Sequence, residues 1–98
     1  MARRRGELES ALVDDMDFCI VCKRPRQQVH HVFGSYNRKK SDDYKYILPL
    51  CEPHHTGTNG VHNNKQMDRQ FKQMAQRHFE QHHGTRKDFI KEFGKSWL

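Results

Sequence analysis

The chain has 98 residues, of which 34% are hydrophobic, and it carries a formal net charge of +6. It forms one domain that is too poor in apolar residues to be stabilised by burial alone, and no run is long and apolar enough to span a membrane. Three cysteines are an odd number, which argues against a closed disulfide framework, and no signal-like stretch follows Met1, so we expect a bound metal, a reducing cytoplasm and no membrane partner.

The excess of basic residues favours a polyanionic partner. Eighteen Lys and Arg stand against twelve Asp and Glu. Each basic side chain that meets a phosphate releases counterions, so nucleic acid is the expected ligand. The alternative is that the charge serves solubility alone.

The chain divides into a flexible basic segment, residues 1–16, and a folded domain, residues 17–98. The first segment opens with three arginines and forms at most a short helix over residues 7–13. "DFCIVCKRPRQQ" is typical of a tight turn, because Cys19 and Cys22 flank two apolar residues and Pro25 blocks a helix.

Two short apolar runs predict a β-hairpin. "VHHVF" (29–33) is β-branched and aromatic and ends at Gly34, whereas "YILPLC" (46–51) contains Pro49, which limits it to an edge or an end of a sheet. The polar residues 34–45 between them predict a long loop.

The C-terminal third predicts two helices. "EPHH" forms a single turn, and a longer helix runs from Asn63 or Asn64, either of which caps it, to about His83. One face of this helix carries Met67, Phe71, Met74, His78 and Phe79. After Gly84, Thr85 and Asp88 form a capping box for a last helix. The residues expected to pack there are Phe89, Ile90, Phe93 and Trp97.

Two pairs of metal-ligand residues predict a zinc site. Cys19 and Cys22, and later Cys51 and His54, are each separated by two residues. Each pair can reach one ion from a single turn, and two such turns complete a tetrahedron. The alternative is three buried cysteines and a loop histidine.

Four further histidines gather around the expected hairpin, namely His30, His31, His55 and His62. Because His55 directly follows a zinc ligand, it can face away from the zinc toward the strand that carries His30 and His31, which indicates a second metal centre. In isolation His30 and His31 also suit an ordinary strand, and His62 also suits a capping position.

These motifs together resemble the HNH endonucleases. The cysteine knuckle, "HHVFG", "YILPLCEPHH" and "GVH" are similar, more narrowly, to the small phage and prophage branch that includes the Ref-type, RecA-dependent nucleases. The resemblance covers about residues 18 to 65. It implies an α+β fold, a zinc-stapled ββα-metal (His-Me finger) unit with additional C-terminal helices, in the cytoplasm of a bacterial host cell.

The resemblance also implies roles for the four histidines. His31 falls on the general base, and His30 falls beside it on a metal-binding position; the two roles are exchangeable, since alternate strand residues face opposite ways. His55 and His62 match the remaining ligands of the catalytic ion. Asp42 and Asp43 are the nearby carboxylates that can orient the base.

This chemistry suits the residue types. An imidazole ordinarily titrates near neutral pH, and one divalent ion stabilises charge on a phosphodiester as a Lewis acid. A histidine-rich site favours Mn²⁺, Ni²⁺ or Zn²⁺ over Mg²⁺. The family's asparagine is replaced, because Tyr46 stands at its position. Asn37, Asp43 or Tyr46 itself remain alternatives for its role of bracing the loop.

Basic residues flank the expected site and predict contacts to phosphates with little sequence preference. They are Arg24, Arg26, Arg38, Lys39, Lys40 and Lys65, with Arg69 and Lys72 further along the same helix. Two functions follow. One is a metal-dependent DNA endonuclease that acts alone or with a recombinase or another phage DNA-processing protein. The other is a non-catalytic zinc module that binds DNA or a protein.

Overall fold

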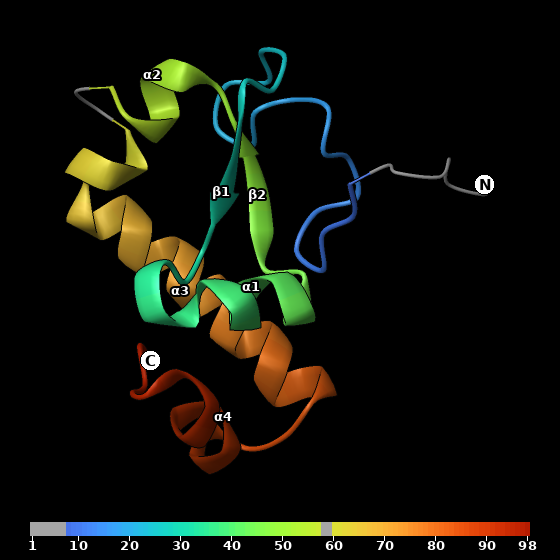
Figure 1. Ribbon diagram of the computed structural model, residues 1–98, viewed down its shortest axis with the longest axis vertical. Coiled ribbons are helices and arrows are strands. Elements are labelled where there is room, and N and C mark those ends of the chain that lie inside the picture. The colour runs from blue at the N-terminus through green and yellow to red at the C-terminus, as the bar shows by residue number, and fades with distance from the viewer. Residues whose placement is uncertain (1–7, 58–59) are drawn as a thin grey trace.

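The protein has an α+β fold built on a two-stranded hairpin. The computed structural model describes residues 8–57 and 60–98. Strand β1 (Gln28–His31) pairs antiparallel with β2 (Ile47–Leu50), with His31 opposite Ile47 (Figure 1). The predicted hairpin is therefore confirmed, with each strand shorter than its apolar run.

The segment between the strands is helical, so the prediction of a loop there was wrong. A 3-10 turn, η1 (Ser35–Asn37), leads into α1 (Arg38–Tyr44). Two side chains of this polar segment face the interior: Ser41 is fully buried, and Tyr44 stacks on Tyr46 with ring centroids 5.7 Å apart. Lys45 has a left-handed φ of 60°, which ends α1 and returns the chain to β2.

Residues 8–16 lie along the outer edge of β2. The Ser10 hydroxyl donates to the carbonyl of Ile47 (2.6 Å), and the Ala11 amide donates to the carbonyl of Lys45 (2.8 Å). Met16 is 4% exposed. The part of the expected flexible segment that the structure describes thus packs on the domain. The short helix expected over residues 7–13 does not form in its described part, 8–13, which is irregular chain with bends. Residues 1–7 lie outside the described part.

The two helices predicted for the C-terminal third are present. Helix α3 (Lys65–His82) crosses behind the hairpin, and the Asn64 side chain caps the helix by accepting from the Met67 amide (3.0 Å) (Figure 1). Helix α4 (Arg86–Phe93) starts with the predicted capping box of Thr85 and Asp88. None of the helices in the described ranges is long and apolar enough to cross a membrane.

Helix α4 buries a narrower face than expected. Phe89 and Phe93 stack with ring centroids 4.8 Å apart inside the core, one turn from each other. Ile90 is 40% exposed, so its predicted burial was wrong: it lies about 100° around the helix from Phe89. Trp97 packs against the core beyond the helix, as expected.

The interior has two clusters of buried side chains. The larger joins the hairpin to α3 and α4 and consists of Val32, Phe33, Tyr46, Leu48, Ala75, Phe79, Phe89 and Phe93. The smaller, at the other end of the hairpin, consists of Cys19, Leu50, Cys51 and Val61. Two of its members are cysteines, so this end of the fold has little apolar material of its own.

Candidate metal centres

A tight turn presents the first two cysteines. The Cys19 amide donates to the carbonyl of Arg24 (2.7 Å), and the Lys23 amide donates to the carbonyl of Cys19 (2.9 Å). Lys23 takes a left-handed φ of 65°. The Ile20 amide donates to the carbonyl of Pro49 (3.0 Å), which fixes the turn against β2.

Helix α2 (Glu52–His55) supplies the other half of this cluster. It begins directly after Cys51, and the amides of His54 and His55 both donate to the Cys51 carbonyl (3.1 and 3.0 Å). His54 therefore turns back toward the thiol of Cys51. We call Cys19, Cys22, Cys51 and His54 the thiol cluster.

The four donor atoms of the thiol cluster all lie within 4.8 Å of one another. Sγ of Cys22 is 3.5 Å from Sγ of Cys51, while Nδ1 of His54 is 3.1 Å from Sγ of Cys51 and 3.8 Å from Sγ of Cys19. Sulfurs bound to one tetrahedral zinc at about 2.3 Å stand about 3.8 Å apart. The spacing suits a single ion, so the cluster could hold a metal such as zinc.

The pKa values of two thiols respond to this setting. Burial raises the pKa of Cys19, but the backbone amides of Cys22, Cys51 and Val21 outweigh burial and lower it to about 6. Burial, together with the neighbouring thiols, raises the pKa of Cys51. Backbone amides that favour a thiolate at Cys19 are what a metal ligand needs.

A second group of donors is formed by His30, His55 and His62, which we call the histidine cluster. One ring nitrogen from each lies within 4.8 Å of the others. Nε2 of His55 is 3.0 Å from Nε2 of His62, and the His30 ring centroid lies 5.5 Å from that of His55 and 5.3 Å from that of His62. His55 and His62 are seven residues apart, whereas His30 lies on β1, so the fold brings His30 to the other two.

Local geometry explains how His62 reaches its partners. It lies in the 3-10 turn η2 (Val61–Asn63), which follows Gly60. A Cβ at Gly60 would stand 2.8 Å from the backbone carbonyl of His55, so only glycine allows this close approach. The turn thereby places His62 against the end of α2.

The histidine cluster contains polar atoms that need a partner. Nε2 of His30 and Nδ1 of His55 are buried, and no hydrogen bond to either is found among the described residues. Burial lowers the pKa of His30 to about 3, with the charges of His55, His62, His31 and Lys72 adding to the effect, and burial also lowers the pKa of His55. Neutral imidazoles with free nitrogens are the form that binds a divalent metal, so the donor set fits a metal ion.

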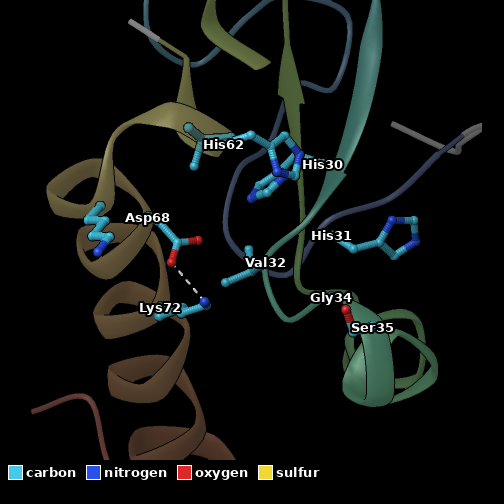
Figure 2. Close-up of a pocket in the computed structure, with 10 residues that line it drawn as sticks. His30, His31, Val32, Gly34, Ser35, His62, Asp68 and Lys72 are labelled. Carbon is cyan, nitrogen blue, oxygen red and sulfur yellow. Dashed lines mark hydrogen bonds and ion pairs between the residues drawn. The ribbon is translucent and has the colours of Figure 1, made fainter. Parts of the chain in front are cut away.

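His31 lies next to this cluster without joining it. Its Nε2 is 2.7 Å from Oδ1 of Asp42 in α1, and the side chain is 18% exposed. In Figure 2 its ring points away from His30 and His62, as adjacent strand residues do. Asp43, the other expected carboxylate, pairs instead with Lys39 (3.3 Å).

Two adjoining cavities, of about 370 and 340 Å³, open beside the histidine cluster. Both are lined by His30, His31, Gly34, Ser35 and His62. Lys65, Asp68 and Lys72 line only the larger. Arg38 and His55 line only the smaller. The His31 ring and the histidine cluster thus border the same space although the rings point in different directions.

The loop after β1 is braced by a residue that sequence reasoning missed. The buried Ser41 hydroxyl donates to the carbonyl of Phe33 (2.7 Å) and accepts from its amide (2.9 Å). Tyr46 is a core residue whose hydroxyl lies 3.1 Å from Nδ1 of His78, and Asn37 donates to the carbonyl of Phe93 (3.1 Å). Ser41 is identified as the brace by its burial. The sequence does not predict this burial, because the neighbouring residues are polar.

The expected phosphate-binding residues occupy different settings. Arg38 and Lys65 line the cavities, and Arg24 is exposed on the cysteine turn. Lys39 is exposed beside its partner Asp43. These side chains are free to reach a ligand at the surface.

Two other members of that set hold the fold together. Nη1 of Arg26 donates to the carbonyl of Met16 (3.0 Å), and Nζ of Lys40 lies 3.4 Å from the carboxylate of Glu92. The first contact closes the turn that carries Cys19 and Cys22, and the second joins α1 to α4 across 52 residues. These two roles could not be predicted from the sequence, because a basic residue in a polar run has the same pattern whether its side chain forms an ion pair or is unpaired.

No family model matches the sequence, and neither a curated protein nor a solved structure matches it significantly.

Proposed function

We propose that this protein is a metal-dependent DNA endonuclease of the HNH type, a ββα-metal unit of phage or prophage origin that hydrolyses phosphodiester bonds with one catalytic ion. The observation that carries the proposal is the pairing of two features around shared cavities. His30, His55 and His62 offer a metal donor set, and the His31–Asp42 pair borders the same space.

In this proposal His31 is the general base. Asp42, 2.7 Å from Nε2 of His31, fixes the ring orientation and stabilises the imidazolium that forms when Nδ1 takes a proton from water. His30, His55 and His62 hold the divalent ion, which supplies Lewis-acid stabilisation of charge on the phosphate. Burial of His30 keeps this ligand neutral and available.

The thiol cluster has a structural role in the proposal. Zinc held by Cys19, Cys22, Cys51 and His54 ties the N-terminal turn to the start of α2. Its four protein ligands leave no open position for chemistry, as is typical of structural zinc. The ion thus adds to the small apolar cluster of Leu50 and Val61 at this end of the domain.

Plasmid nicking tests the proposal. Purified protein with Mn²⁺ or Ni²⁺ is expected to convert supercoiled plasmid to open circles, and His31→Ala is expected to lose this activity while keeping its zinc and its melting temperature. His82→Ala removes an exposed histidine of α3 outside both clusters and serves as the matched control. If wild type and His31→Ala leave the plasmid equally intact with every metal, the proposal fails.

The second candidate function is a non-catalytic zinc module. It needs only the thiol cluster and gives the histidine cluster no catalytic role. Metal stoichiometry separates the two functions. One tightly held zinc with no second site supports the module, whereas a second, exchangeable ion that disappears in His55→Ala supports the enzyme.

A further inference from the structure

The two cavities form one groove across the histidine cluster. They share five lining residues, including His30 and His62, and diverge on either side of them. An ion held by the cluster therefore lies where the cavities meet. A ligand longer than one phosphate has room to extend in both directions from that point.

Both parts of the groove carry cations. Lys65 and Lys72 of α3 line the larger cavity, and Arg38, the first residue of α1, lines the smaller. Figure 2 shows Lys72 and Asp68 reaching from α3 toward the strand that carries His30. Lys72 and Arg38 come from different helices, so the fold and not sequence proximity puts them on one groove.

Lys72 is held in place before any ligand arrives. Its Nζ is 2.7 Å from a carboxylate oxygen of Asp68 and 4.6 Å from the ring centroid of Trp97, and its side chain is 18% exposed. A lysine fixed in this way loses less side-chain entropy on meeting an anion than a free surface lysine does. Lys95 also lies over Trp97, at 4.2 Å, but does not line the groove.

We propose that one nucleic-acid strand runs along this groove, with three successive phosphates held by Lys72, by the metal at the histidine cluster and by Arg38. This inference rests on the proposed nuclease function and adds the path of the strand. The metal-bound phosphate is the one that is cut, and the two flanking phosphates set its register.

Synthetic strands with a counted number of charges test the path. The probes are short single-stranded DNAs with neutral methylphosphonate linkages except for one, two or three adjacent phosphodiesters. Binding is measured with Mn²⁺ in the His31→Ala background, which prevents cleavage. We expect each added phosphate to raise affinity about tenfold, up to three, because each gains a charge-assisted contact.

The variants separate the three positions. Arg38→Gln and Lys72→Gln are each expected to lose the gain from the third phosphate, and the double variant is expected to lose the gain from the second as well. Lys95→Gln, which removes the other cation over Trp97, keeps all three steps. Lys72→Arg restores the third step, which a purely structural role for Lys72 would not require.

A further variant separates charge from folding. Asp68→Asn breaks the same ion pair as Lys72→Gln but leaves the ammonium over Trp97, so it is expected to keep a third step. If the third phosphate adds nothing in the His31→Ala parent, or if both single variants keep all three steps, the strand path is wrong. A protein that nicks plasmid but fails here remains a nuclease with another strand path. One that passes here but never nicks is a strand-binding protein.

Discussion

Ser41→Ala tests whether the loop after β1 depends on a single buried hydroxyl. In the native protein this hydroxyl donates to the carbonyl of Phe33 and accepts from its amide, at 2.7 and 2.9 Å, and Ser41 is fully buried. Alanine fills nearly the same volume, so the substitution removes the two hydrogen bonds and changes packing little. The carbonyl and the amide of Phe33 are then left without a partner inside the protein.

The expected loss is large for one oxygen atom. A buried polar group without a partner costs about 1–3 kcal/mol, and relaxation around the site favours the lower half of that range. Two such groups give a loss of about 2–4 kcal/mol in the free energy of unfolding. A domain of this size has roughly 5–15 kcal/mol in total, so the variant is folded but clearly less stable.

Urea denaturation followed by circular dichroism measures the effect, with the same saturating zinc concentration for each protein. The midpoint is expected to fall while the slope stays constant, because the surface exposed on unfolding is unchanged. Ser35→Ala, at an exposed serine of the adjoining turn η1, is the control and is expected to change stability by less than about 0.5 kcal/mol. A loss below about 1 kcal/mol for Ser41→Ala would refute the assignment of this hydroxyl as the brace.

Three further substitutions have expected outcomes. Cys51→Ser is expected to abolish tight zinc binding and cooperative unfolding, as seen by metal analysis and thermal melting, because zinc affinity is folding energy at this end of the domain; unchanged zinc content would contradict it. Burial lowers the pKa of His30 to about 3, so between about pH 6.5 and pH 3 the unfolded chain binds a proton that the folded protein does not, and stability falls as the pH falls. The difference in unfolding free energy between pH 7 and pH 5 is therefore expected to be smaller in His30→Gln than in wild type. An equal difference in the two proteins would count against the reasoning. Phe89→Ala is expected to cost about 3–5 kcal/mol, because a fully buried ring is lost between α3 and α4; a thermal shift of only a few degrees would show that the core collapses around it.

The hairpin and the two C-terminal helices could be predicted because their signals are local. Thr85 and Asp88 mark the start of α4 by spacing alone, and the apolar positions of α3 recur with the helical period. The same holds for the Cys-x2-Cys and Cys-x2-His spacings, whose donors the fold brings within 4.8 Å of one another. Residues a few positions apart stay close together in the folded protein, so their spacing in the sequence predicts their contacts.

Helix α1 and the packed N-terminal segment could not be predicted in this way. The segment that contains α1 is polar throughout, and it is helical because Ser41 and Tyr44 meet partners from Phe33 and Tyr46. Ser10 likewise reaches the edge of β2, far away in the chain. Tertiary contacts decided these conformations against weak local preferences.

The candidate site shows the same division. The histidine pair on β1, the histidine that follows His54 and the lysine Lys72 could be named from sequence, whereas Asp68 enters the cavity only through the course of α3. A charged residue on a helix gives no sign of which neighbour it will face. Only the arrangement of α3 and the hairpin places Asp68 in the cavity beside Lys72.

His54 and His55 are consecutive residues that belong to different centres. His54 turns toward the thiols and His55 toward the histidines, within a four-residue helix anchored by the carbonyl of Cys51. Two changes can displace Cys51: an oxidant that converts its sulfur to a sulfenic acid, or a shortage of zinc in the cell. Either change also disrupts the helical turn that positions His55. The catalytic activity we propose would then depend on the zinc supply and redox state of the cell, because His54 and His55 are adjacent residues of α2.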